Sequence, residues 1–394
     1  MKYNFDKSVA RYNTESMKWD HMGKIFPVFA NKDLLPLWVA DMDFQCAPPI
    51  KEAIQKRVDH NVWGYTICGD DYYEVVTQWM SRRHDWHIDK NSIVYSRGIV
   101  PALSFFVQTF TNPGDSVIIQ RPVYYPFTAV VENNGRHVAN NTLVYKDSKY
   151  TIDFVDLEKK AQDATTKLMF LCSPHNPVGR VWLPEELEKI GDICINNDVV
   201  LVSDEVHGDL VFNGHKHFPI TKVSKKFEKN TIICTAASKT FNLAGMHTSN
   251  IVIPNKKLRD NYTRTAFDKC FQLDANPIGI EATKAAYLYC EDWLNELLVY
   301  VENNMKYVAQ FCKENIPGVS LVPPEGTYLA WLDFSALNIT KEQLTNLIVD
   351  QCQIALDEGY FFGDEGIGFE RMNVACPRST IEECLQRIAG AVKR

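Results

Sequence analysis

Short runs of apolar residues recur through the middle of the chain, and each ends in small or polar residues. The runs are SIVYS (92–96), DSVIIQ (115–120), KLMFLC (167–172), VVLVSD (199–204) and TIICTA (231–236). Continuous apolar runs of this length suit strands that are buried on both faces. The pattern therefore predicts an α/β fold with a mostly parallel sheet.

Helical periodicity lies between and after these runs. LPEELEKIGDICINND (183–198) has a proline in its first turn and apolar residues on one face, which predicts a helix and hence a βαβ unit. Apolar residues from Trp293 to Cys312 step by three or four, which predicts a long helix connecting two domains. Near the end, Ser379 and Glu382 have the spacing of a capping box, followed by a final amphipathic helix.

Length and composition predict two domains. The chain has 394 residues, 45% of them hydrophobic and 12% aromatic, which is enough apolar surface for two cores. We expect a large α/β domain over residues 45–284. We expect a smaller α+β domain built from both chain ends, residues 1–44 and 285–394.

Charge and cysteine usage narrow the class of partner and the compartment. A net charge of −7 without a long basic run gives no support for a nucleic-acid or anionic-membrane partner, so a small molecule is favoured. The eleven cysteines form no CxxC pair, which argues against a disulfide framework and structural zinc. No stretch approaches the roughly 20 apolar residues of a membrane span, and we expect a cytoplasmic protein. His215 and His217 form an HxH pair, but they lack a further ligand pattern, and we predict no metal site.

Chemically useful residues follow the predicted strands. In open α/β sheets the ligand lies beyond the carboxyl ends of the strands, where loops and helix N-termini converge. One edge of the sheet would then hold a helix N-terminus, aromatic rings, an amide, a carboxylate and an amine. The residues concerned are Gly98 to Val100, Tyr124 and Tyr125, Asn176, Asp204, and Ser238 with Lys239.

This set matches the needs of pyridoxal 5'-phosphate. A lysine amine forms a Schiff base with an aldehyde, and a carboxylate keeps a pyridine nitrogen protonated. An aromatic face stacks on the ring, and a helix N-terminus with a serine binds a phosphate. Each residue also has a structural alternative: Lys239 as a solvated charge, Asn176 as a turn residue, and Tyr124 as a core aromatic.

Three longer motifs resemble those of a known superfamily. SPHNPVGR (173–180), SDEVHGDL (203–210) and SKTFNLAGMHTSN (238–250) are similar to successive signatures of the fold-type I aminotransferases. WVADMDF (38–44), WGYT (63–66) and the histidine of DEVH resemble the MalY/PatB branch, the C–S lyases that cleave cystathionine and cysteine conjugates. The likeness covers the chain in the right order and implies a PLP-dependent transferase fold.

The resemblance implies roles around the cofactor. Lys239 would form the Schiff base, Asp204 would pair with the pyridine nitrogen, Asn176 would donate to the ring 3-oxygen, and Tyr124 would stack on the ring. The phosphate would be held by the backbone of Ile99 and Val100, by Ser238, and by Tyr65 of a second subunit, so a homodimer with shared active sites is expected. The resemblance also assigns His207 and His247 to the cofactor site.

The same resemblance places the substrate beside Arg371, Tyr125 and Asp41. A guanidinium offers two parallel donors to the α-carboxylate, although Arg371 also has the alternative of a surface ion pair. Many aminotransferases carry a tyrosine where this chain has His207, and an arginine where it has His247. The first change fits the lyase branch, and the second leaves the phosphate with a weaker, pH-dependent positive partner.

The implied reaction is α,β-elimination of an amino-acid thioether to pyruvate, ammonia and a thiol. The same residues would also serve transamination, so an aminotransferase is the alternative enzyme. A regulatory protein that keeps the cofactor as a structural ligand is a further alternative, but it would need neither Lys239 nor Arg371.

Overall fold

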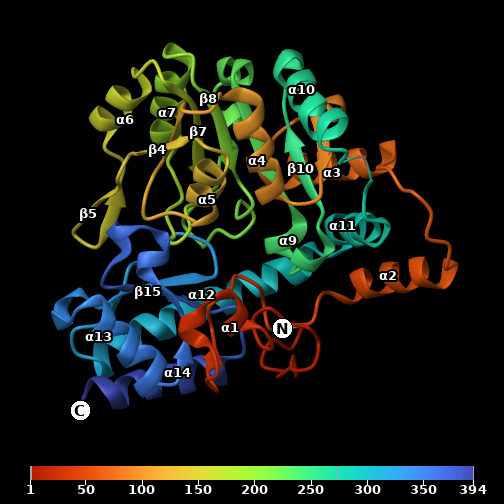
Figure 1. Ribbon diagram of the computed structural model, residues 1–394. Coiled ribbons are helices and arrows are strands. Elements are labelled where there is room, and N and C mark those ends of the chain that lie inside the picture. The colour runs from red at the N-terminus through yellow and green to blue at the C-terminus, as the bar shows by residue number, and fades with distance from the viewer. Residues whose placement is uncertain (1, 273, 394) are drawn as a thin grey trace.

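The computed structural model describes residues 2–272 and 274–393. Its main feature is a seven-stranded sheet in the order β2-β10-β9-β8-β7-β3-β4 (Figure 1). β10 is antiparallel to both neighbours and the other strands run parallel, so the predicted mostly parallel sheet is confirmed. All five predicted runs form strands. The strands are β2 (Ile93–Ser96), β10 (Ser249–Val252), β9 (Thr231–Thr235), β8 (Val200–Asp204), β7 (Thr166–Cys172), β3 (Ser116–Ile119) and β4 (His137–Asn140).

The sheet separates two apolar cores. Successive side chains of a strand point to opposite faces, so Leu168 and Phe170 of β7 join one core while Met169 and Leu171 join the other. Both faces are covered by helices, which is why these strands are continuously apolar. The first core is covered by α4 (Ile99–Phe110), α5 (Pro126–Asn133) and α10 (Lys256–Thr263). The second is covered by α3 (Asp70–His84), α7 (Pro184–Asn196) and α11 (Pro277–Tyr289).

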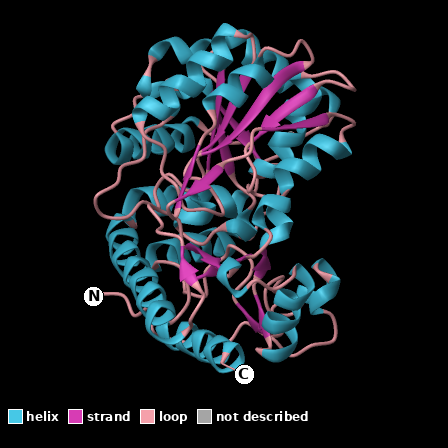
Figure 2. Ribbon diagram, turned by 90° about the vertical axis from the view of Figure 1, so that its left-hand side faces the viewer, coloured by secondary structure: helices cyan, strands magenta, loops and turns pink. Residues whose placement is uncertain are grey.

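A smaller antiparallel sheet lies in the C-terminal part of the chain (Figure 2). Its strands, in spatial order, are β11 (Ser320–Leu321), β12 (Leu329–Asp333), β15 (Phe369–Asn373) and β14 (Asp357–Glu358). An N-terminal and a C-terminal segment of the chain pair beside it, because β1 (Leu35–Pro36) is parallel to β13 (Ile354–Ala355). A separate hairpin consists of β5 (Val144–Lys146) and β6 (Lys149–Thr151).

The predicted helices are present, with one correction. α7 begins at Pro184, and α12 (Glu291–Asn315) buries every apolar residue of the predicted stripe. α14 (Arg378–Val392) also forms, but the predicted capping box is wrong. Pro377 starts the helix earlier, so Ser379 lies inside its first turn, and Tyr300 Oη accepts the free Arg378 N–H at 2.9 Å. The cap is therefore supplied by a tertiary contact that sequence spacing does not show.

The remaining helices are short, apart from α2 next to the N-terminal segment. They are α1 (Met22–Ile25), α2 (Pro48–His60), α6 (Phe154–Ala161), α8 (Ile220–Val223), α9 (Ala237–Thr240) and α13 (Lys341–Thr345). Among the described residues, no helix combines the length and apolar character needed to cross a membrane. The two sheets lie within residues 93–252 and 320–373, and the domain boundaries at 45 and 284 stay a prediction.

Candidate active site

Several predicted site residues lie where parallel strands of the large sheet end. β7 leads into the loop of Asn176, β8 ends at Asp204, and β9 leads into α9, which carries Ser238 and Lys239. Because β7, β8 and β9 are adjacent and parallel, these residues share one edge of the sheet. This edge is the candidate active site.

The N-terminus of α4 opens onto the same edge. Gly98 follows β2 with a φ of 147°, a conformation that favours glycine, and it precedes Ile99 and Val100 in the first turn. The first backbone N–H groups of a helix have no partner within the helix. The turn therefore presents donors suited to a phosphate.

Lys239 is held within the protein. Its side chain is half-buried, and Nζ donates to the carbonyl oxygen of Ala40 at 2.7 Å. Burial lowers the pKa of the amine to about 8, with Arg371 acting in the same direction and the charges of Asp41 and Asp204 opposing it. A pKa of about 8 leaves a far larger neutral fraction at neutral pH than the ordinary value of 10.5 would, and a nucleophilic or basic amine acts in its neutral form.

Asp204 is a buried carboxyl at the strand end. Oδ1 accepts the backbone N–H of Val206 at 3.3 Å. Burial raises the pKa of Asp204 to about 7, although the nearby Lys239 charge opposes the rise. A buried carboxyl of this kind stabilises a proton-bearing or cationic ring nitrogen placed against it.

Arg371 lies on β15 and is buried against the same site. Nη1 donates to Asn176 Oδ1 at 2.9 Å, and Nη2 donates to the carbonyl of Trp38 at 3.0 Å. Nη2 also pairs with Asp357, the residue directly opposite on β14. Burial raises the pKa of Asp357 to about 6 against the opposing charge of Arg371. The guanidinium is thus preoriented by three acceptors from three segments of the chain, and it is not a surface ion pair.

The tyrosine pair stands beside Asn176. The backbone N–H of Tyr124 donates to the carbonyl of Asn176 at 3.1 Å, and the Tyr124 and Tyr125 ring centroids are 5.5 Å apart. Both side chains are half-buried. Burial raises the pKa of Tyr125 to about 12, and burial with neighbouring negative charge also raises the pKa of Tyr124. Both phenols are therefore neutral and offer aromatic faces.

His207 is buried close to the lysine. Burial lowers its pKa to about 3, and the positive charges of Lys239 and Arg371 add to the effect. Its ring lies 6.1 Å from that of Tyr328, edge to face. Tyr328 Oη donates to Ala40 O at 3.0 Å, so this carbonyl accepts from both Tyr328 and Lys239. His207 is therefore a neutral imidazole.

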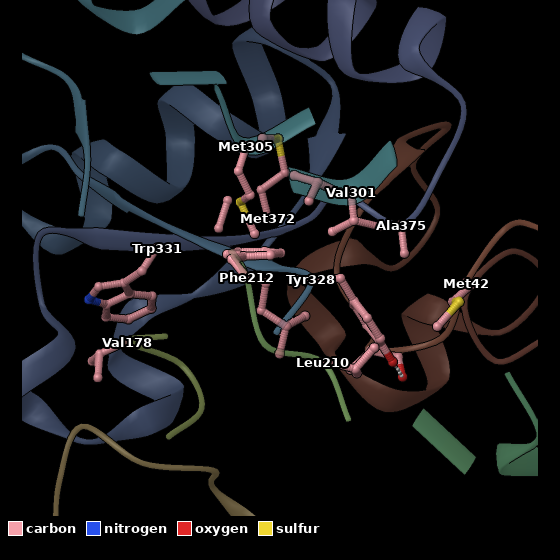
Figure 3. Close-up of a cluster of buried hydrophobic side chains, with 14 of the residues drawn as sticks. Met42, Val178, Leu210, Phe212, Val301, Met305, Tyr328, Trp331, Met372 and Ala375 are labelled. Carbon is pink, nitrogen blue, oxygen red and sulfur yellow. Dashed lines mark hydrogen bonds between the residues drawn. The ribbon is translucent and has the colours of Figure 1, made fainter. Parts of the chain in front are cut away.

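A cluster of apolar side chains fixes the position of Arg371 relative to the strand ends. Figure 3 shows Val178 and Leu210, from the loops after β7 and β8, with Trp331 of β12 and Met372 of β15. Tyr328 lies in the same cluster. The packing joins the small sheet, which carries Arg371, to the loops that carry Asn176 and Asp204.

Asp41 lies on the N-terminal segment that passes the site, and it is already engaged. Its two oxygens accept from Arg11 at 2.9 and 2.7 Å. The segment is anchored by Asn242, whose Oδ1 accepts the Met42 N–H at 2.9 Å. The predicted contact of Asp41 with substrate stays a prediction.

Two predicted cofactor residues have exposed side chains in the single chain. Tyr65 is 99% exposed on the loop between α2 and α3. His247 has an exposed side chain and a φ of 47°, and its carbonyl accepts from Tyr95 Oη at 3.1 Å. Their roles stay predictions.

The two histidines of the HxH pair lie in different surroundings. His215 is exposed, whereas His217 is buried and forms a hydrogen bond with Glu205 at 2.9 Å.

Sequence reasoning missed Asp357, Tyr328 and the carbonyls of Trp38 and Ala40. Asp357 reaches the site through the register of β14 with β15, and Tyr328 through the turn before β12. No motif marks either residue. The WVADMDF motif did point to the N-terminal segment, but not to its backbone as the functional part.

Comparison with known proteins identifies the family. The family model described as aminotransferase class I and II matches residues 32–388. The chain belongs to the aminotransferase class I and II family. It is 42% identical over 393 residues to cystathionine beta-lyase PatB of Bacillus subtilis (strain 168), covering 99% of this chain and 100% of that protein. It is 32% identical to Protein MalY of Escherichia coli (strain K12), with 99% of each chain covered.

A solved structure supports the same placement within the family. Cystalysin from Treponema denticola, which contains a pyridoxal 5'-phosphate cofactor, matches with a TM-score of 0.95 and 41% identity. The match covers 100% of this chain and 99% of that chain. The predicted resemblance to the MalY/PatB branch and the predicted fold-type I architecture are both confirmed.

Proposed function

We propose that the protein is a pyridoxal 5'-phosphate-dependent carbon–sulfur β-lyase. It would convert L-cystathionine or an S-substituted L-cysteine, with one water, into pyruvate, ammonia and a thiol. The observation that carries the proposal is the position of Lys239, Asp204 and Arg371 around one sheet edge. Two similar proteins support the same chemistry, and both match over nearly the whole chain. PatB is named a cystathionine beta-lyase, and cystalysin contains pyridoxal 5'-phosphate.

The residues present fit the cofactor. The donors at the start of α4 suit its phosphate, and the buried Asp204 suits its pyridine nitrogen. Asn176 Oδ1 already accepts from Arg371, which orients its amide N–H₂ as a donor for the ring 3-oxygen. Ser238 is next to Lys239 and would add a hydroxyl to the phosphate, and the Tyr124 ring would stack on the pyridine.

The chain's own residues divide the work of the reaction. When bound, the cofactor accepts the electron pair left at the substrate α-carbon. Arg371 would bind the α-carboxylate through its remaining N–H groups, including Nε, which has no partner among the described residues, and so orient the Cα–H bond. The neutral amine of Lys239 takes the α-proton, and Asp204 holds a proton at the pyridine nitrogen throughout. Neutral His207 adds no further cation beside these groups.

Product analysis with L-cystathionine tests the function. We expect pyruvate, ammonia and homocysteine in equal amounts, without any 2-oxo acid being added. Lys239→Ala should abolish turnover, and it should change the visible spectrum of the yellow protein because the amine that attaches the cofactor is gone. Turnover that depends on an added 2-oxo acid and yields no thiol would identify an aminotransferase instead. Cofactor retention without any turnover would favour the regulatory alternative.

We further propose a homodimer with shared active sites. The loop between α2 and α3 exposes several apolar side chains that a partner subunit would cover. They are Val62, Trp63, Tyr65 and Ile67, exposed by 61%, 49%, 99% and 78%. The Tyr65 hydroxyl would reach the phosphate of the neighbouring subunit, which gives this fully exposed ring a function.

A cytoplasmic location is also proposed. Eight of the eleven cysteines are buried, where a reduced thiol packs as a small hydrophobe. A reducing compartment suits such a chain. The substrate is a small amino-acid thioether, and the net charge of −7 gives no support for a nucleic-acid partner.

A further inference from the structure

Four buried titratable side chains lie behind the candidate active site, and the reaction described above uses none of them. They are His84, Glu205, Asp209 and His217, which we call the paired-imidazole cluster. Together they line a cavity of only about 10 Å³. Such a space holds one water at most, so the cluster is solid packing and not a ligand pocket.

One arm of the cluster reaches the lysine. Asp209 Oδ1 accepts from His84 Nε2 at 2.7 Å, and Oδ2 accepts from Thr240 Oγ1 at 2.8 Å and Trp79 Nε1 at 3.3 Å. Burial alone raises the pKa of Asp209, but the bonds from His84 and Thr240 outweigh it and hold the pKa below its usual value. Thr240 follows Lys239 directly in α9. The ionised carboxylate therefore fixes the turn from which the amine projects.

The other arm reaches the strand end of Asp204. Glu205 follows Asp204, and it accepts from His217 Nε2 and Ser203 Oγ, each at 2.9 Å. It also accepts the backbone N–H of Ile220 at 3.1 Å. Ser203 and Glu205 flank Asp204 on both sides. Their bond therefore ties down the backbone on either side of the buried carboxyl.

The two arms meet at their imidazoles. The rings of His84 and His217 pack edge to face, 5.5 Å apart at 89°. Gly208 passes so close that an added Cβ would lie 2.8 Å from His217 Cδ2. Lys222 of α8 donates to the carbonyl of His84 at 2.9 Å. Because every member is confined, a shift in one arm displaces the other.

We propose that the paired-imidazole cluster positions the two reacting groups relative to each other. His84 and Asp209 are positioning residues for Lys239, acting through Thr240. His217 and Glu205 are positioning residues for Asp204, acting through Ser203. The inference rests on the proposed function only in assigning Lys239 and Asp204 to one cofactor.

Thr240→Val tests the lysine arm with the smallest change in volume. It removes the hydroxyl bonded to Asp209, and we expect kcat per cofactor-loaded site to fall about 10- to 100-fold while KM changes little. Thr240→Ser, which restores a hydroxyl, should recover most of the loss. Thr221→Val is the matched control, since the buried Thr221 hydroxyl of α8 has no partner among the described residues. A Thr240→Val protein with wild-type kcat per loaded site would overturn the proposal for this arm.

His217→Leu and His217→Gln test the Asp204 arm, because only glutamine can still donate to Glu205. We expect the leucine variant to release pyridoxal 5'-phosphate faster on dialysis and to shift the pH midpoint of its visible band. The glutamine variant should lie near wild type in both measurements. If both variants change only the unfolding temperature, the role is structural and the proposal fails. Should the leucine variant not fold, Ser203→Ala replaces it and is judged by the same two measurements.

The measurements of cofactor release and of the visible band separate the positioning proposal from the lyase assignment. Cofactor release and the visible band need no C–S cleavage. A wild-type protein that binds the cofactor but forms no thiol would overturn the lyase function alone. The effects of His217→Leu on cofactor binding would still decide the positioning role.

Discussion

At the scale of single residues, the site depends on two ionisable groups whose pKa values burial has shifted toward neutral pH. Lys239 and Asp204 have pKa values of about 8 and about 7, shifted from opposite ends of the scale. A group that takes or holds a proton during a reaction works best when its pKa lies near the working pH. The sequence could predict both residues, because each follows a buried strand within a recognisable motif. It could not predict their pKa values, which depend on packing from distant segments.

Asp357 leads to a prediction about Arg371, the residue proposed to bind the substrate carboxylate. Asp357→Asn leaves the buried Arg371 without its charged partner, and we expect the ligand-free protein to lose about 3 kcal/mol of unfolding free energy. An amino-acid carboxylate should then restore more stability to the variant than to the wild type, because it would replace the negative charge that Arg371 has lost. Thermal unfolding with and without an unreactive amino acid measures both effects.

Asp350→Asn is the matched control for Asp357→Asn. Asp350 pairs with Lys32 at the surface and is 47% exposed, so its loss should change stability little. Equal stabilisation of Asp357→Asn and wild type by the amino acid would show that Asp357 does not compete for Arg371.

At the scale of elements, the register between paired strands sets which residues face each other, and the sequence alone does not show it. β14 has two residues, yet its pairing with β15 sets Asp357 opposite Arg371 and Glu358 opposite Glu370. Five of the seven strands of the large sheet could be predicted because both their faces are apolar. β4 carries polar and partly exposed residues and β14 has only two residues, so their positions follow from neighbours far away in the chain. The cap of α14 was mispredicted for the same reason, since Tyr300 supplies it from α12.

The Glu358–Glu370 pair predicts how stability changes with pH. Burial, together with the neighbouring Glu358, raises the pKa of Glu370 well above its usual value. The folded protein therefore keeps a proton that the unfolded chain releases, and the stability from this group is lost as pH rises toward the folded pKa. Glu370→Gln mimics the protonated acid. Its unfolding free energy relative to wild type should rise with pH above about 4.3, by at most about 1.4 kcal/mol per pH unit.

Denaturant unfolding between pH 5 and pH 8 measures the slope, at about 25 °C where these conversions hold. Glu383→Gln, a surface change at a residue 51% exposed, is the control. A difference between Glu370→Gln and wild type that stays constant over this range would show that Glu370 is not protonated in the folded protein.

At the scale of the whole molecule, the proposed dimer can be tested by complementation. Lys239→Ala removes the amine from its own subunit, whereas Tyr65→Ala removes a residue from the neighbour's site. In a mixed dimer, one site recovers both native residues and the other carries both defects. Refolding the two inactive variants together in equal amounts should restore about a quarter of wild-type activity, since half of the dimers are mixed and each has one intact site.

Activity that stays at the level of the separate variants would contradict the shared site. Analytical ultracentrifugation of the same samples shows whether dimers formed at all. An active monomer would remove the role proposed for Tyr65.

The N-terminal segment touches the site through its main chain. Trp38 O accepts from Arg371, and Ala40 O accepts from Lys239 and Tyr328. A point mutation cannot delete a carbonyl group, so these acceptors persist whatever side chains occupy positions 38 and 40. Insertion or deletion of one residue there would displace them all. The length of this segment should therefore be constrained as strictly as its side chains, of which Trp38 is fully buried.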